Sequence, residues 1–181
     1  MALARRLVLA LPLLLLARPA GAAAKAELWP RWLAHDDNSS LTVDHSRWSA
    51  FLARYRHLGS DRIARLAYGR VGAADRQALD AYLDFLQSIP VSALSRTAQR
   101  AFWINLYDAL TVRLVLAHYP VASIRDIDIS PGLFTSGPWR AILATVEGEK
   151  ITLDDIEHRI LRPIWRDPRI HYVLNCADRA R

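Results

Sequence analysis

Four side chains in the last part of the sequence have the types needed for covalent acyl chemistry. Cys176 is the single cysteine of the 181 residues, and Glu157, His158 and His171 come shortly before it. A cysteine becomes a nucleophile when a histidine within hydrogen-bonding distance removes its proton, and a carboxylate can orient that histidine. The four residues therefore suggest a nucleophile, a base and an orienting acid.

The pairing of Cys176 with His171 depends on the conformation of the chain between them. The alternation in residues 169–175 predicts a strand, with His171 and Asn175 on one face. If that strand runs regularly to Cys176, the two side chains lie about 16 Å apart and on opposite faces. A regular strand thus excludes this pair, and the base would be His158, His118 or a residue beyond position 181. The other interpretation of the lone thiol is a buried and inert side chain.

Glu157 belongs to a helix that the sequence ITLDDIEHRILRP predicts. Thr152 and Asp155 have the spacing of a capping box at its start, and Pro163 is expected to end it after about three turns. At about 100° per residue Glu157 falls inside the apolar arc, so its carboxylate must be paired, hydrogen-bonded or protonated. It is either the partner of an arginine or a backbone segment, or a site carboxylate.

A longer helix carries two further polar residues. The run AFWINLYDALTVRLVLAHYP, with Ser95 as N-cap and Pro120 as stop, has no wholly polar face, so the helix should be buried on most sides. Asn105 and Asp108 are three positions apart and therefore neighbours on one face. They either satisfy backbone groups or line a cleft that binds substrate.

The remaining patterns predict an α+β fold. Helical spacing starts near Ser46 and again over 74–87, and a short strand is expected over 141–146 before a turn at 147–150. We expect the N-terminal helices to pack on a small mixed or antiparallel sheet.

The first 24 residues have the pattern of a secretory signal peptide, with cleavage expected after Ala24. Its apolar core of about 11 residues is shorter than a membrane span, so we expect no permanent span and a periplasmic or secreted protein. Loss of its three arginines lowers the formal charge from +6 to +3. The other basic residues are scattered, which argues against nucleic-acid binding. Residues 25–43 predict an irregular segment.

Cofactor and metal fingerprints are absent from the sequence. It contains no phosphate-binding loop, dinucleotide fingerprint or serine nucleophile elbow, and no close cysteine pair or His-x3-His spacing for zinc. We therefore predict no cofactor and no metal. A single cysteine also excludes an internal disulfide.

Three motifs together resemble one known family. AFWINLYDALTVRLVLAHYP, ITLDDIEHRILR and DPRIHYVLNCA, in this order, are similar to the domain of unknown function 547 family over roughly residues 44–177. The resemblance implies a shared site containing the polar motif residues Asn105, Glu157, His158, His171, Asn175 and Cys176. Exported bacterial members typically carry a similar leader.

The sequence departs from the family pattern at two places. Asp108 stands where the family usually has asparagine. After Cys176 the family usually continues with small residues and a second Cys-Pro or Ser-Pro step, whereas this sequence ends at Arg181. We therefore expect residues 44–181 to be a C-terminally truncated domain, whose unpaired last strand would favour self-association.

These observations support two hypotheses. In the first, the complete domain is a cysteine-dependent hydrolase or acyl-transfer enzyme with Cys176 as nucleophile, His158 as one candidate base, and Glu157 and Asn105 as orienting residues. In the second, it is a non-catalytic envelope binding or scaffold module. Asn105, Asp108, Glu157 and His171 then form a hydrogen-bond network within the core.

Overall fold

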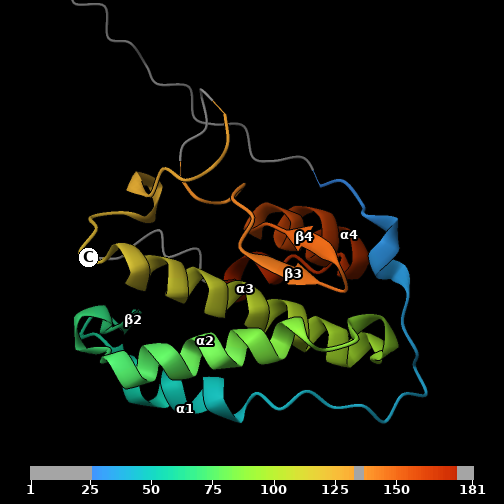
Figure 1. Ribbon diagram of the computed structural model, residues 1–181, viewed down its shortest axis with the longest axis horizontal. Coiled ribbons are helices and arrows are strands. Elements are labelled where there is room, and N and C mark those ends of the chain that lie inside the picture. Colours follow the sequence, from blue (N-terminus) through green and yellow to red (C-terminus); the bar gives the residue numbers. More distant parts are fainter. Residues whose placement is uncertain (1–25, 133–136, 175–181) are drawn as a thin grey trace, which may run out of the picture.

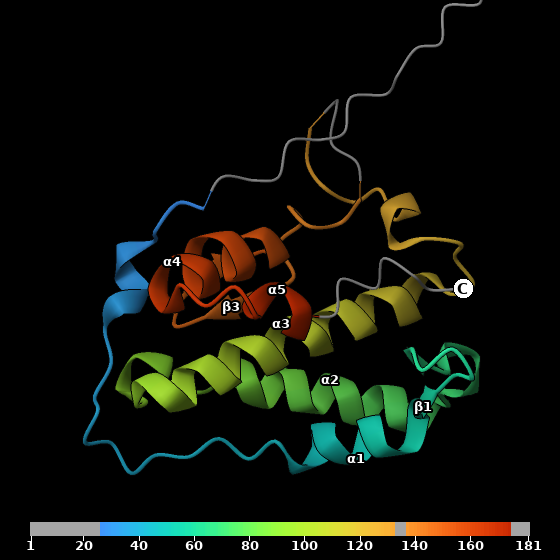
Figure 2. The ribbon, with the colours of Figure 1, turned by 180° about the vertical axis from the view of Figure 1, so that it is seen from behind.

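The computed structural model describes residues 26–132 and 137–174, which form an α+β fold, as predicted. In chain order the elements are η1 (Pro30–Leu33), α1 (Ser46–Tyr55), β1 (Arg56–Leu58), β2 (Ala64–Leu66), η2 (Tyr68–Arg70), α2 (Ala73–Gln87), η3 (Val91–Ala93), α3 (Arg96–His118), η4 (Ile124–Asp126), β3 (Ala144–Val146), β4 (Glu149–Ile151), the π-helix η5 (Asp155–Leu161), α4 (Arg162–Trp165) and α5 (Ile170–Val173). They form layers: α1 lies against α2, α2 against α3, and β3, β4 and the C-terminal helices lie over the other side of α3 (Figures 1 and 2).

Helix α3 is the central element, and it matches the prediction closely. Ser95 caps its start by accepting a hydrogen bond from the Ala98 amide at 3.3 Å. Phe102, Leu106 and Leu110 are fully buried on it. A helix that packs against neighbours on most sides must be apolar around its circumference, which explains the absence of a polar face.

The two sheets are antiparallel hairpins. The predicted strand over 141–146 and turn at 147–150 contain β3 and the turn of the second hairpin, whereas β4 and the first hairpin were not predicted. Strand β3 pairs with β4, with Ala144 opposite Ile151. Glu147 and Gly148 turn the chain with positive φ angles of 47° and 83°, as a tight hairpin turn requires. The other hairpin pairs β1 with β2, and its residues are mostly exposed, so no apolar alternation revealed it.

The predicted strand over 169–175 is wrong in its described part, because residues Ile170–Val173 form helix α5. Ile170 and Leu174 are buried, four positions apart, whereas Tyr172 between them is 86% exposed. This spacing is helical, since a strand would place all three residues on one face. The unpaired strand on which we based self-association is therefore not present in residues 169–174.

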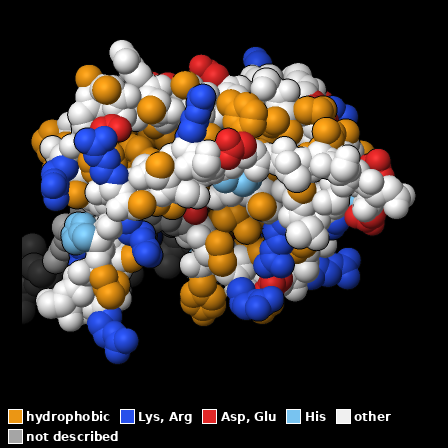
Figure 3. Space-filling model, turned by 90° about the horizontal axis from the view of Figure 1, so that it is seen from below, with side chains coloured by type: hydrophobic (Ala, Val, Ile, Leu, Met, Phe, Trp, Pro, Cys, Tyr) orange, Lys and Arg blue, Asp and Glu red, His pale blue; other side chains and the backbone are white. Residues whose placement is uncertain are grey.

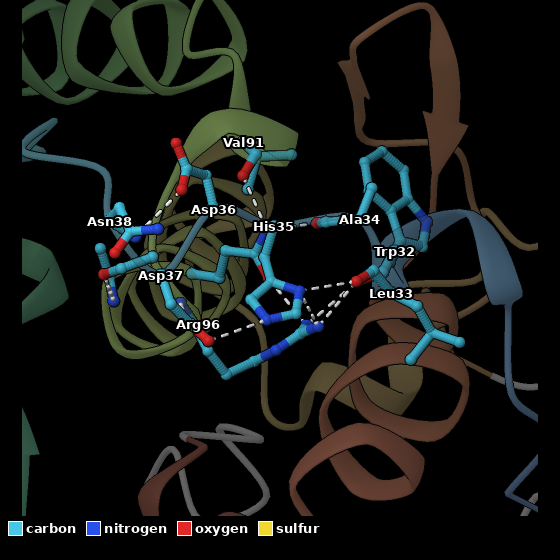
Figure 4. Close-up of polar contacts among 12 residues, drawn as sticks. Trp32, Leu33, Ala34, His35, Asp36, Asp37, Asn38, Val91 and Arg96 are labelled. Carbon is cyan, nitrogen blue, oxygen red and sulfur yellow. Dashed lines mark hydrogen bonds and ion pairs between the residues drawn. The ribbon is translucent and has the colours of Figure 1, made fainter.

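An N-terminal segment, residues 26–45, runs along the outside of the layers and is held by Arg96 of α3 (Figure 4). The Arg96 guanidinium donates to the carbonyls of Trp32 at 3.2 Å and Leu33 at 2.7 Å. It also lies 2.7 Å from Nδ1 of His35. The same Nδ1 lies 2.9 Å from the Leu33 carbonyl, and Nε2 of His35 lies 3.2 Å from Oδ2 of Asp37, so the ring is held on both sides by the N-terminal segment.

Charged side chains show no concentration on the α1 side of the molecule. On that face Lys and Arg side chains are spread among hydrophobic and other side chains (Figure 3). Within residues 26–132 and 137–174, no helix combines the length and the apolar character that crossing a bilayer requires.

His45, at the start of α1, makes the stability of the fold depend on pH. Burial lowers the pKa of His45 from 6.5, partly offset by the charge of Asp44, and Nδ1 lies 2.6 Å from the Tyr82 hydroxyl. Below pH 6.5 the unfolded chain binds a proton at His45 more readily than the folded protein does, so stability falls as the pH falls. We expect His45→Gln to reduce the stability difference between pH 7.5 and pH 5.5, as measured by urea unfolding. An unchanged difference would contradict this assignment.

Candidate functional site

The helix that carries Glu157 begins at the predicted capping box. The Asp155 amide donates to Thr152 Oγ1 at 3.0 Å, and the Thr152 amide donates to Asp155 Oδ2 at 3.1 Å. Asp155 Oδ1 also pairs with Arg159 at 2.8 Å. These contacts satisfy amide groups of the first turn and fix where the helix starts, and hence which face Glu157 occupies.

Beyond the cap, the helix has an unusual conformation at the candidate residues. Residues Asp155–Leu161 form the π-helix η5, and the helical path continues through Pro163 to Trp165 as α4. Our prediction that Pro163 ends the helix is therefore wrong. π-helical turns are rare and occur frequently at functional sites, because they change where side chains point. Glu157 and His158 both lie on this turn.

The N-terminal segment stabilises the π-helical turn. Pro163 has no amide hydrogen, so carbonyls one turn before it lose a helical partner. The Glu27 amide donates to the His158 carbonyl at 3.1 Å, and the Trp29 amide donates to the Arg159 carbonyl at 3.0 Å. The guanidinium of Arg159 in turn lies 4.5 Å from the centre of the Trp29 ring. The backbone around the candidate site thus depends on residues near the start of the described chain.

Glu157 lies between two imidazole rings. Its side chain is 9% exposed, with Oε2 4.0 Å from His158 Nε2 and Oε1 3.5 Å from His171 Nδ1. These distances exceed the roughly 2.7–3.2 Å of a strong hydrogen bond, so each contact is weak with a neutral ring and is strengthened by charge when the ring is protonated. The interpretation of Glu157 as the partner of an arginine is not what the structure shows. Its described neighbours are the two histidines, which come from different helices.

The two histidines differ in what they can do. His158 has a 15% exposed side chain, and its Nδ1 lies 3.0 Å from Arg162 Nη1. Since arginine only donates, Nδ1 accepts and neutral His158 carries its proton on Nε2, toward Glu157. His171 is 70% exposed and presents Nδ1 to Glu157. Its Nε2 is therefore the ring nitrogen that remains for a reacting group.

Asp154 is a neighbour that the sequence analysis did not propose as a site residue. Burial raises the pKa of the Asp154 carboxyl, the charge of Glu157 acts in the same direction, and His158 and Arg140 oppose it. Its amide donates to the Trp139 carbonyl at 3.0 Å, which joins this turn to the loop before β3. The feature of the sequence that could have identified Asp154 as a site residue is its spacing of one helical turn from His158.

The other predicted residues lie elsewhere or outside the described chain. Asp108 on α3 faces Tyr68, and burial together with the charge of Asp108 raises the pKa of Tyr68 to about 12. Asn105 is half-buried on the same helix, and its side chain makes no hydrogen bond to the residues that the structure describes. Asn175 and Cys176 lie outside the described residues.

His118 ends helix α3 and does not join the pair of imidazoles at Glu157. Its Nδ1 lies 2.9 Å from the Leu114 carbonyl, a capping contact within the helix. No group of three or more His, Cys, Asp or Glu side chains in the described ranges is arranged to hold a metal ion.

Comparison with known proteins assigns the chain to a family. A search of curated proteins and a search of solved structures each return no match. The family model described as "Protein of unknown function, DUF547" matches residues 91–181, which include all of α3, the π-helical turn and α5. This match spans half of the chain, and it includes every residue proposed for the site. The chain is therefore a member of the DUF547 family.

Proposed function

We propose that this domain is a cysteine-dependent hydrolase or acyl transferase in which Cys176 is the nucleophile, His171 the base and Glu157 the residue that orients the base. The observation that carries the proposal is the contact of His171 Nδ1 with the buried Glu157 carboxylate. A carboxylate at Nδ1 favours the tautomer in which Nε2 accepts a proton, and it stabilises the imidazolium that then forms. His158 would help to position Glu157 from its other oxygen.

The helical conformation of residues 170–173 removes the reason for excluding this pair. The estimate of about 16 Å between the side chains of His171 and Cys176 assumed a regular strand. Five residues span at most about 17 Å when extended and less when folded, so the chain length permits contact. His171 is also preferable to His158 as the base, because both ring nitrogens of His158 face protein groups.

The proposed reaction has two half-reactions. His171 Nε2 takes the thiol proton, and the Cys176 sulfur attacks the carbonyl carbon of an ester, amide or thioester. Collapse of the tetrahedral intermediate breaks the bond to the leaving group, which receives the proton from His171 and leaves an acyl-cysteine thioester. Water or another nucleophile then attacks the thioester while His171 removes its proton, and the thiol is regenerated on collapse.

The reactivity of Cys176 tests this proposal, because the chain has no other thiol. We expect iodoacetamide to alkylate Cys176 at pH 6.5 with a rate midpoint clearly below the ordinary thiol pKa of about 8.5. His171→Gln should slow alkylation at pH 6.5 about tenfold and return the midpoint to about 8.5, whereas His118→Gln should change neither. Intact-mass spectrometry follows the reaction. A midpoint near 8.5 in the unmodified protein would refute the proposal.

The scaffold hypothesis makes a different prediction for Glu157. If the carboxylate only supports the core, Glu157→Gln should lower the free energy of unfolding and leave the alkylation rate of the folded protein unchanged. If it orients His171, the same variant should slow alkylation at pH 6.5 with a smaller change in stability, because the amide is the same size. Measuring both quantities on one sample separates the two roles.

A further inference from the structure

A pocket beside the second half of α3 combines positive charge with an apolar surface. It has a volume of about 350 Å³, which lies at the lower end of the range for small-molecule sites. Residues from the middle of α2, from the second half of α3 and from the loop before β3 line it. Its apolar wall is formed by leucines, including Leu79, Leu114 and Leu143.

Two arginines, Arg76 and Arg113, line the same pocket, and both are held in place by backbone groups. Arg76 Nη1 donates to the Leu116 carbonyl at 2.6 Å, and Arg113 Nη2 donates to the Leu143 carbonyl at 2.7 Å. A guanidinium has five N–H donors, so each retains several for another acceptor. Among the residues that the structure describes, neither arginine forms an ion pair.

The single acid at this pocket does not cancel the charge. Asp80 is exposed and lies one helical turn after Arg76 on α2, but it forms no ion pair within the described part of the chain. Two guanidinium groups and one carboxylate leave one net positive charge at the pocket. Half-buried arginines that are already held in place bind an anion with little loss of side-chain entropy.

We propose that this pocket binds a small amphipathic molecule with one anionic head group, a carboxylate or a phosphate monoester, and a short apolar chain. The head group accepts hydrogen bonds from Arg76 and Arg113, and the apolar chain lies against the leucines. This site uses none of the residues of the proposed acyl chemistry, so it would be a second site on the domain and is tested separately.

Titration of the full chain with octanoate and with octyl phosphate, followed by calorimetry, tests the proposal. We expect saturable 1:1 binding of at least one of them, and the tighter of the two identifies the head group. Octyltrimethylammonium, with a similar chain and the opposite charge, should bind at least about tenfold more weakly. Equal binding of the cationic and anionic compounds, or no saturable binding of either anion, would overturn the proposal.

Three substitutions locate the binding without removing a contact of the arginines. Ala117 is exposed and lines the pocket, so Ala117→Glu should weaken anion binding about tenfold, while its neutral control Ala117→Gln should change it less than about threefold. Asp80→Asn removes the one negative charge and should tighten binding. Binding that is insensitive to Ala117→Glu and to Asp80→Asn would place the ligand elsewhere and refute this site.

Discussion

Trp103→Ala is expected to lower the free energy of unfolding by about 3–5 kcal/mol, the typical cost of removing a large buried aromatic side chain. Trp103 is 1% exposed on α3. Its ring meets Trp32 edge to face with 4.9 Å between centroids, and Phe102 at 5.0 Å. The substitution removes a core side chain and also the surface on which the N-terminal segment rests. Urea unfolding followed by circular dichroism measures the change.

Trp29→Ala provides the control for this prediction. Trp29 also contacts Trp32, with 5.7 Å between centroids, but it is only half-buried. The same truncation should therefore cost about 1–2 kcal/mol, because less surface is returned to water. Equal losses for the two variants would contradict the role assigned to the deeper burial of Trp103.

Gln99→Leu is expected to cost about 2–3 kcal/mol, although leucine is the more hydrophobic residue. Gln99 is 2% exposed, and its amide group donates to the carbonyls of Ala34 at 2.7 Å and Val91 at 2.8 Å. Its oxygen accepts from Arg96 at 2.9 Å. Leucine makes none of these bonds, so the Val91 carbonyl keeps only the Leu94 amide as a donor and the Ala34 carbonyl loses the Gln99 amide. Chemical unfolding measures the loss, and limited proteolysis of residues 34–45 should accelerate with it.

The same substitution at Gln87 separates burial from hydrogen bonding. Gln87 of α2 also makes two bonds to backbone groups, donating to the Leu83 carbonyl and accepting from the Thr145 amide at 2.8 Å. It is half-buried, so water can replace the lost partners, and Gln87→Leu should cost less than about 1 kcal/mol. A similar cost at both positions would contradict the role assigned to burial at Gln99.

Helix α3 and the start of the helix that carries Glu157 were predictable from the sequence because their signals are local. Ser95 caps α3 through a contact three residues away, and Thr152 and Asp155 form the capping box within one turn. Signals of this kind do not depend on the rest of the fold. The α+β class followed from the same patterns.

The C-terminal strand prediction failed because alternation and helical spacing coincide over a short stretch. Ile170 and Leu174 are two of three apolar residues in an alternating run, and they are also one helical turn apart. Asp167 decides between the two conformations. It accepts a hydrogen bond from the Arg169 amide at 2.9 Å, and its carbonyl accepts one from the Ile170 amide at 3.1 Å, which starts a helical turn.

The sequence supplied the residue types of the candidate site but not their arrangement. Glu157 was placed inside an apolar arc, and it is buried. The approach of His171 to Glu157, however, depends on how α5 packs against η5. The π-helical turn could not be predicted either, because its stabilising donors are the amides of Glu27 and Trp29, far away in the sequence.

That distance has a consequence for how the protein folds. The bonds from residues 27 and 29 to the carbonyls of His158 and Arg159 close a loop of about 130 residues, and the entropy of closing it must be lost before the contacts form. The contacts of α2 with α3 are closer in sequence and are expected to form earlier. During synthesis, Glu27 leaves the ribosome long before its partner is made. The chain is thus expected to acquire its π-helical turn, and the arrangement around Glu157, among the last steps of folding.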